Sequence, residues 1–321
     1  MKPCVSLVIP IYNEEDNLPE LRRRLDGVLS AEDALAFEIV LVDDHSLDCT
    51  RELCLEWVNQ DPRVRYLRMS RNFGSHAACT AGLEEAQGDA ALVMAADLQD
   101  PPEDVPKLLR SWEGGAQVVW AVRSAREGEP LSRILPARVY YWLMRHVAKL
   151  DLPPEGADFV LVDRCVIDAV LRCRETSASL FALVSWAGFR QTSVPYVKRA
   201  RHAGQSGWTV RKKVRLLVNS IVGFTLWPVR LLLVIGVLAA SAAIGYAVLL
   251  IVLRLSGRIT VSGFTAVMVT MLFGFGLVMV MIGMLGEYLW RALEHARARP
   301  RYLLEERANP SASHRLEQTR A

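Results

Sequence analysis

Short apolar runs alternate with longer segments of mixed polarity over the first third of the chain. The apolar runs have the length of β-strands, and the segments between them show the spacing of amphipathic helices. Strands are predicted at 5–10, 37–42, 64–68 and 91–96, and helices at 18–29, 50–60 and 75–86. Strands that alternate with helices of this length are typical of a mostly parallel, doubly wound α/β sheet.

Polar residues follow each of these strands. The polar segments are 10–14, 43–44, 70–74 and 97–100. Parallel strands bring their carboxyl ends to one edge of a sheet, and ligands of open α/β sheets bind beyond that edge. The helices that begin after these loops also present partial positive charge, which favours phosphate groups. The pattern therefore predicts one site built from all four segments.

The most distinctive of these segments follows the fourth strand. The apolar run stops at Asp97, and Pro101 and Pro102 prevent its simple continuation. Asp97 and Gln99 are two residues apart on an extended segment, so the oxygens of both side chains can face one hard cation. A solvated turn with an incidental acid is the alternative interpretation of this stretch taken alone.

Composition and motif content exclude several classes of protein. The dinucleotide motif GxGxxG and the P-loop motif GxxxxGK[ST] are both absent, which disfavours a dehydrogenase and a P-loop NTPase. The net charge of +3 is too small to indicate a nucleic-acid partner. The six cysteines form no CxxC pair and no zinc-like spacing, as expected for reduced thiols of a cytoplasmic domain.

Four motifs together resemble the family 2 (GT-A fold) glycosyltransferases, and in particular the branch that makes polyprenyl- or dolichyl-phosphate sugars. They are the segments 8–15, 42–46, 70–74 and 97–103, and the resemblance extends over about residues 4–230. It implies a nucleotide-sugar donor, a divalent metal (Mg²⁺ or Mn²⁺) and inversion at the anomeric carbon. It assigns the metal to Asp97 and Gln99. It assigns the nucleotide to residues at the first three strand ends, which are Pro10, Tyr12, Glu14, Asp43, Asp44, Arg71 and Asn72.

Two positions depart from the family pattern. Ala95 stands where the family usually has the first aspartate of its acidic motif, and His45 stands where it usually has glycine. A glycine permits a positive φ, which histidine tolerates less well. The loss of the first aspartate keeps open a second hypothesis, a membrane-anchored nucleotide-sugar-binding or scaffold protein with impaired catalysis.

The middle of the chain is predicted to build the acceptor side. Arg123 and Arg126 end the next strand, and Arg201 lies in a segment that resembles the family loop closing over the phosphates. The planar guanidinium suits phosphate, although a solvated basic loop explains Arg123 and Arg126 equally well. Asp158 resembles a family residue near the acceptor pocket and is the available general base for a hydroxyl acceptor. The predicted catalytic set is therefore Asp97, Asp158, Arg123, Arg126 and Arg201.

The last third of the chain is predicted to meet a membrane. Residues 231–253 and 262–286 contain no charged side chain, and each stretch is long enough to cross a hydrocarbon core of about 30 Å. Segment 211–230 begins basic and continues apolar at helical spacing. In a predicted helix at 136–150, basic residues are interleaved with an apolar face. Both patterns suit a membrane interface, and packing within the protein is the alternative. Basic residues are more numerous outside the two stretches than between them, which predicts cytoplasmic termini.

The sequence thus predicts a cytoplasmic GT-A domain at 1–210, an interface segment at 211–230, two transmembrane helices within 231–286, and a basic helix with a mobile tail at 287–321. No signal peptide precedes the first strand, so the domain is expected to stay in the cytoplasm. The expected activity is metal-dependent sugar transfer from a UDP- or GDP-sugar to polyprenyl (undecaprenyl) phosphate at a bacterial inner membrane. Another lipid or glycan acceptor, and a homo-oligomer, stay open.

Overall fold

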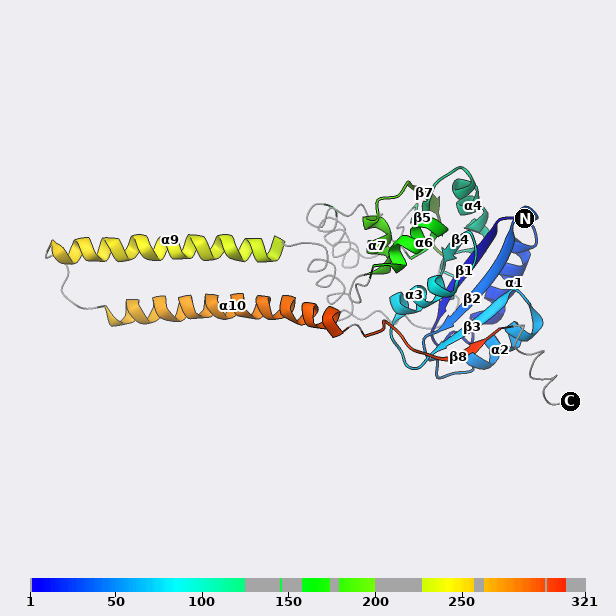
Figure 1. The fold of residues 1–321 in the computed structure, drawn as a ribbon, viewed down its shortest axis with the longest axis horizontal. Helices are drawn as coiled ribbons and strands as arrows, with labels where there is room; N and C mark the ends of the chain where they lie inside the picture. Colours follow the sequence, from blue (N-terminus) through cyan, green and yellow to red (C-terminus); the bar gives the residue numbers. More distant parts are fainter. Residues whose placement is uncertain are drawn as a thin grey trace. The chain divides into compact units, whose positions relative to one another are not determined.

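The computed structural model describes residues 2–124, 145, 158–173, 179–199, 227–256, 263–297 and 299–309 (Figure 1). The chain divides into two compact units, Met1–Ser220 with Pro300–Ala321, and Ile221–Arg299. Several predicted features lie outside the described residues. They are Arg126, Arg201, the interface segment up to residue 226 and, except for residue 145, the helix at 136–150.

The first unit is built on an eight-stranded sheet with the order β7-β5-β6-β4-β1-β2-β3-β8. β1, β2, β3 and β4 are mutually parallel neighbours, so the predicted common edge of their carboxyl ends exists. β6 runs antiparallel between β4 and β5, β7 is parallel to β5, and β8 is antiparallel to β3. The strands are β1 (Cys4–Ile11), β2 (Ala36–Asp43), β3 (Val64–Met69), β4 (Ala90–Val93), β5 (Val118–Arg123), β6 (Val160–Asp163), β7 (Gln191–Tyr196) and β8 (Leu304–Ala308).

Helices cover both faces of this sheet, which explains why its central strands are apolar at nearly every position. The leucines of α1 at positions 18, 21, 25 and 29 follow helical spacing and are buried in the same core as alternate residues of β1. On the other face α3 lies against β1 and β2, where a Cβ on Gly82 would stand only 2.2 Å from Val8 Cγ1. The helices are α1 (Leu18–Leu29), α2 (Thr50–Gln60), α3 (Ser75–Glu85), α4 (Val105–Glu113) after a 3₁₀ turn η1 (Pro102–Asp104), α6 (Arg164–Leu171) and α7 (Leu180–Trp186).

The four strands and three helices predicted between residues 5 and 96 are confirmed, although β4 ends at Val93. The sheet is mixed, because β6 and β8 oppose the other strands. The prediction of a mobile tail is wrong for residues 305–308, which belong to β8. The charged sequence LEERA carries no strand signal of its own. The backbone of β8 pairs with the free edge of β3. Ion pairs hold its side chains, including Arg51–Glu306 at 2.8 Å and Arg307–Glu85 at 2.9 Å.

The second unit consists of α9 (Trp227–Leu255) and α10 (Phe264–Arg297), which run antiparallel side by side (Figure 1). Large apolar side chains such as Leu233 and Phe273 are exposed along both helices. Among the described residues one stretch, Phe273–Trp290 of α10, is long and apolar enough to cross a membrane, and the apolar stretch of α9, Leu231–Tyr246, is shorter. The predicted pair of transmembrane helices is therefore not confirmed. The predicted separate basic helix from residue 287 is a continuation of α10.

Asp163 forms the N-cap of α6. Its carboxylate accepts hydrogen bonds from the backbone N–H of Cys165 at 3.0 Å and from Trp112 Nε1 at 2.8 Å. Burial alone would raise the pKa of Asp163, but these hydrogen bonds lower it below its ordinary value. The stabilisation is therefore present at neutral pH and is lost as the pH falls through the lowered pKa.

Replacing Asp163 with alanine is expected to lower the free energy of unfolding at pH 7 by about 1–2 kcal/mol, because α6 loses its cap and Trp112 its acceptor. Urea unfolding followed by tryptophan fluorescence measures this difference. The difference in unfolding free energy between the variant and the wild type should become smaller below about pH 4, where the Asp163 carboxylate of the unfolded chain is protonated. Asp163→Asn, which keeps a capping oxygen, should lose less, and equal unfolding midpoints for the alanine variant and the wild type at pH 7 would contradict the assignment.

Candidate functional site

Strained backbone gathers at the carboxyl edge of the parallel strands. Within the described ranges the non-glycine residues with positive φ are Asn13 (54°), His45 (64°) and Leu98 (59°), and they follow β1, β2 and β4 respectively. Histidine and leucine rarely adopt this conformation, and such strain is typical of functional sites. The expectation that position 45 suits a glycine is therefore confirmed in the backbone. We call the segments 12–15, 43–48, 70–74 and 95–100 the strand-end site.

The loops after β1 and β2 are interlocked by hydrogen bonds. Asn13 N donates to Ser46 Oγ at 2.9 Å, and Leu47 N donates to Asn13 Oδ1 at 2.9 Å. Glu14 N donates to Thr50 Oγ1 at 2.9 Å. Tyr12 stays 43% exposed at the mouth of these loops, as its predicted contact with a nucleotide requires. Pro10 and Glu14 are half-buried beside it.

Asp43 is buried beneath the loops that follow β1 and β2. Its side chain has no exposed area and accepts hydrogen bonds from Ser46 N at 2.7 Å, Tyr66 Oη at 2.7 Å and Arg68 Nη1 at 3.1 Å. Burial and the charge of Asp43 raise the pKa of Tyr66, so its hydroxyl stays a donor. The predicted direct contact of Asp43 with the nucleoside does not fit this enclosure. Asp43 instead fixes the loop on which the exposed residues stand.

Asp44 joins the loop after β2 to the loop after β3. Its two carboxylate oxygens accept from Phe73 N at 2.6 Å and Gly74 N at 2.8 Å. Burial raises the pKa of Asp44, against the effect of these two hydrogen bonds. The guanidinium of Arg71 lies over the ring of Phe73, 4.2 Å from its centroid. Arg71 and Asn72 are exposed on this loop, so both predicted donor-binding side chains are accessible.

The turn after β4 carries the predicted metal ligands. Asp97 is 6% exposed and accepts a hydrogen bond from Gln99 N at 3.2 Å across the strained Leu98. Over the described parts of the chain, no three His, Cys, Asp or Glu side chains are grouped as metal ligands. One carboxylate and an amide oxygen fit a hard cation whose remaining ligands are water and substrate phosphates, which is how Mg²⁺ commonly binds.

Arg123 at the end of β5 and Tyr196 at the end of β7 lie close to this turn. Asp100 is buried and accepts a hydrogen bond from Tyr196 Oη at 2.7 Å. Burial raises the pKa of Asp100, and the nearby charges of Asp158 and Asp97 raise it further. Burial alone would lower the pKa of Arg123, but contact with Tyr196 and the charges of Asp158 and Asp100 raise it. Arg123 is paired with Tyr196 in the sheet, and Tyr196 bonds to Asp100, so Arg123 lies close to the turn that carries Asp97. The catalytic roles of Asp97, Arg123 and Asp158 stay predictions.

Asp100 and Tyr196 were not predicted as site residues. Asp100 belongs to the same acidic turn as Asp97, so its position was a usable signal. Tyr196 ends a strand far along the sequence, and only the pairing of β7 with β5 brings it beside Arg123. The Nε of Arg123 is buried and has no hydrogen-bond partner among the described residues, which leaves a donor for an anionic oxygen.

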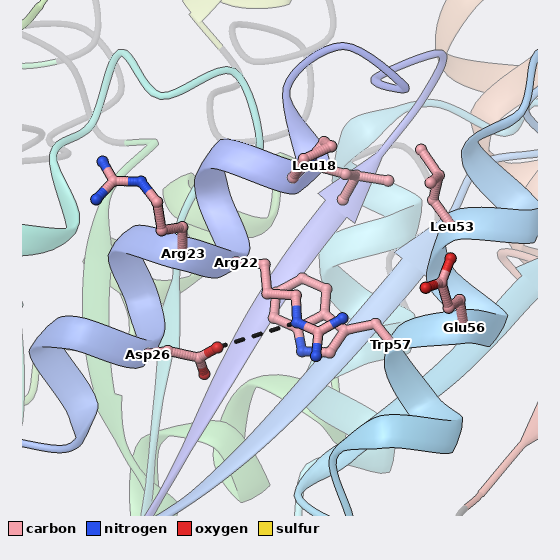
Figure 2. A pocket seen from close by; sticks show the side chains of 8 residues that line it. Leu18, Arg22, Arg23, Asp26, Leu53, Glu56 and Trp57 are labelled. Atoms are coloured by element: carbon pink, nitrogen blue, oxygen red, sulfur yellow. Dashed lines mark ion pairs between the residues drawn. The ribbon is translucent and has the colours of Figure 1, made fainter.

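A groove of about 310 Å³ lies elsewhere, between α1 and α2 (Figure 2). Arg22 lies over the indole of Trp57, 5.8 Å from its ring centroid, and its Nε is 3.9 Å from Asp26 Oδ2. None of the strand-end residues lines this groove. The groove is lined by Leu18, Pro19, Arg22, Arg23, Asp26, Leu53, Glu56 and Trp57.

Comparison with known proteins gives a consistent result. The family model described as glycosyl transferase family 2 matches residues 6–170. An undecaprenyl-phosphate 4-deoxy-4-formamido-L-arabinose transferase of Pseudomonas fluorescens (strain Pf0-1) is 35% identical over 94% of this chain and 89% of its own length. A prophage bactoprenol glucosyl transferase homolog of Escherichia coli (strain K12) is 32% identical over 94% of this chain and 98% of its own length.

Solved structures share the fold at lower sequence identity. The crystal structure of glucosyl-3-phosphoglycerate synthase from Mycobacterium tuberculosis, in complex with Mn²⁺, uridine diphosphate and glucosyl-3-phosphoglycerate, aligns with a TM-score of 0.50. It is 17% identical and covers 68% of this chain and 78% of that chain. The likeness identifies the sheet and its flanking helices as the GT-A type of fold.

Proposed function

Because this chain belongs to glycosyl transferase family 2, we propose that it transfers a sugar from a UDP- or GDP-sugar to polyprenyl phosphate at the cytoplasmic face of a membrane. One relative described above is named an undecaprenyl-phosphate sugar transferase and the other a bactoprenol glucosyl transferase homolog, and the two names specify different sugars. The observation that carries the proposal is the link from Arg123 through Tyr196 to Asp100, which lies in the same turn as Asp97. The identity of the sugar is left to experiment.

The donor nucleotide is assigned to the strand-end site. Tyr12 is exposed at the mouth of the interlocked loops, and Arg71 and Asn72 are exposed on the neighbouring loop. A nucleoside diphosphate needs an apolar or aromatic surface for its base and positive charge for its phosphates. Tyr12 and Arg71 supply these two properties at neighbouring strand ends, and Asp43 and Asp44 hold the loops that present them.

A divalent cation, Mg²⁺ or Mn²⁺, is assigned to Asp97 and Gln99. The Mycobacterium tuberculosis enzyme of the same fold was solved with Mn²⁺ and uridine diphosphate, and the oxygen ligands of this turn suit either cation. Such a cation supplies charge neutralisation for the departing diphosphate. Asp97 holds its own turn through the backbone of Gln99, so the ligand geometry is set before any substrate arrives.

The acceptor phosphate is assigned to the Arg123 side of the edge. A phosphate monoester is already anionic at neutral pH, so its oxygen needs alignment more than deprotonation. The buried Nε of Arg123 can donate to that oxygen, and Asp100 and Asp158 balance the charge of the guanidinium. With a hydroxyl acceptor Asp158 would have to act as the base, so the phosphate acceptor demands less of this site.

A two-helix membrane hairpin built from α9 and α10 completes the proposal. Exposed apolar side chains along both helices suit a hydrocarbon environment, and α10 contains a stretch of spanning length. Basic residues flank the helices on the side of Arg230 and Arg291, which favours cytoplasmic termini. A lipid-linked phosphate would then meet the catalytic unit at the bilayer surface.

The test uses the full chain purified in detergent with undecaprenyl phosphate, Mg²⁺ or Mn²⁺, and a panel of UDP- and GDP-sugars. Mass spectrometry of the extracted lipid should reveal one new hexose- or pentose-phosphate polyprenol. The product should disappear when the cation is chelated and return when it is restored. Tight nucleotide binding without product from any donor would instead support the scaffold hypothesis, for which the half-buried Ala95 beside Asp97 is the favouring observation.

A further inference from the structure

The pairing of β8 with β3 contains a bulge at Glu305. Arg68 is opposite Glu306 and Met69 is opposite Leu304, so Glu305 has no partner residue on β3. Ser70 N donates to Leu303 O at 2.9 Å, which continues the pairing beyond the bulge. Bulges are common beside active sites, where the extra residue re-aims a side chain. At this bulge the re-aimed side chain is a carboxylate.

The Glu305 carboxylate points to the strained loop of the strand-end site. Glu305 Oε2 lies 3.4 Å from His45 Nδ1 and 3.5 Å from Arg68 Nε. His45 Nδ1 is also 3.0 Å from the carbonyl oxygen of Met69, which immediately precedes the loop after β3. The ring of His45 is thus held between the last residue of β3 and the bulged residue of β8, while its backbone keeps a φ of 64°.

His45 follows Asp44, the residue that holds the loop carrying Arg71 and Asn72 through the N–H groups of Phe73 and Gly74. A left-handed conformation is unfavourable for a non-glycine residue, so it persists only where its surroundings enforce it. A weak contact that enforces it can therefore change how often the loop is correctly formed without much effect on global stability.

We propose that Glu305 is a positioning residue for nucleotide-sugar binding, which acts through the strained conformation of His45; this inference rests on the proposed function. The C-terminal strand, separated by more than two hundred residues of sequence from the loop it supports, then belongs to the donor site. Arg68 contributes from the other side, since it contacts Glu305 and also donates to Asp43 Oδ2 and Ser46 O, both at 3.1 Å.

Glu306 provides a matched control on the same strand. It is a neighbouring glutamate that accepts two hydrogen bonds from Arg51 on α2, at 2.8 and 2.9 Å. In the part of the chain that the structure describes, its side chain forms no ion pair with His45 or Arg68. The probes are UDP and GDP, each with Mn²⁺, and the readout is the equilibrium dissociation constant of the full-length protein. Glu305→Gln should raise the dissociation constant of the more tightly bound nucleotide about three- to tenfold. Glu306→Gln should change the same constant less than twofold.

A double-mutant cycle with His45→Gly tests the route of the effect. Glycine adopts a positive φ without strain, so the loop no longer needs an external support. Adding Glu305→Gln to His45→Gly should therefore weaken nucleotide binding by less than twofold. The same three- to tenfold loss in both backgrounds would show that Glu305 does not act through His45 and would overturn the proposal, as would equal effects of the two glutamate variants.

Amide hydrogen exchange separates this inference from the proposed function. Glu305→Gln should speed exchange at Phe73 and Gly74 several-fold in the protein without nucleotide, and Glu306→Gln should not. If the wild-type protein binds neither nucleotide while the two glutamate variants still differ in exchange, the donor role and the proposed function are contradicted. The coupling between Glu305 and the loop then still holds. Unchanged exchange at both amides in Glu305→Gln, with or without nucleotide binding, would overturn the coupling itself.

Discussion

Asp97→Asn is expected to reduce sugar transfer by about 10²–10³-fold, the range seen when a preorganised charge-stabilising group is removed. Asparagine keeps the size of the side chain and an oxygen for the N–H of Gln99, so the turn should survive. What disappears is the negative charge that we propose holds the cation. The initial rate at saturating donor, measured by radiolabelled sugar in the lipid phase, reports this loss, and the half-saturating Mn²⁺ concentration should rise in parallel.

Asp104→Asn is the control for this variant. Asp104 ends the 3₁₀ turn η1 of the same acidic segment, but it pairs with Lys107 outside the strand-end site. The Asp104→Asn protein should transfer sugar at a rate within about twofold of the wild type, since substitutions outside the site have small effects. If Asp97→Asn retained the wild-type rate and the wild-type Mn²⁺ dependence, the metal would have to bind elsewhere.

Asp43→Ala is expected to lower the free energy of unfolding by about 3–5 kcal/mol, the cost of breaking a buried ionic network by removing one partner. The substitution leaves the buried hydroxyl of Tyr66 and the N–H of Ser46 without their acceptor. It also takes a carboxylate from Arg68. Urea unfolding of the detergent-solubilised protein, followed by near-ultraviolet circular dichroism, measures the change.

Two further variants make this result specific. Asp43→Asn keeps an acceptor for Ser46 but loses the charge beside Arg68, so it should fall between alanine and the wild type. Asp33→Ala removes an exposed aspartate and should shift the unfolding free energy by less than about 0.5 kcal/mol. An Asp43→Ala protein as stable as Asp33→Ala, with impaired nucleotide binding alone, would return Asp43 to the nucleoside contact predicted from the sequence.

The parallel half of the fold could be predicted because local signals and tertiary packing agree there. β1, β2 and β4 are apolar over most of their length, and each of the first four strands ends at a polar loop. The location of Asp97, Gln99, Arg71 and Asn72 at one edge follows from that arrangement. The positive φ at position 45 was also accessible, since a histidine in a glycine position indicates a special backbone conformation.

Other features depend on contacts that sequence patterns do not encode. β8 is a strand because β3 has a free edge, and its alternation of leucine, glutamates and arginine has little strand propensity of its own. The enclosure of Asp43 depends on Tyr66 and Arg68 from the next strand. The sequence therefore could not show whether the Asp43 side chain faces a ligand or the protein core. Tyr196 reaches Asp100 only through the order of the sheet.

The position of β8 at the end of the sheet also affects how the catalytic unit can be isolated. A truncation after the region matched by the family model would remove β8 and expose the whole backbone edge of β3. Unpaired strand edges recruit other strands, so such a fragment is prone to edge-to-edge aggregation. A water-soluble version of this protein should therefore delete the apolar helices internally and keep residues 301–309, rejoined through a flexible linker, as the cap of its own sheet.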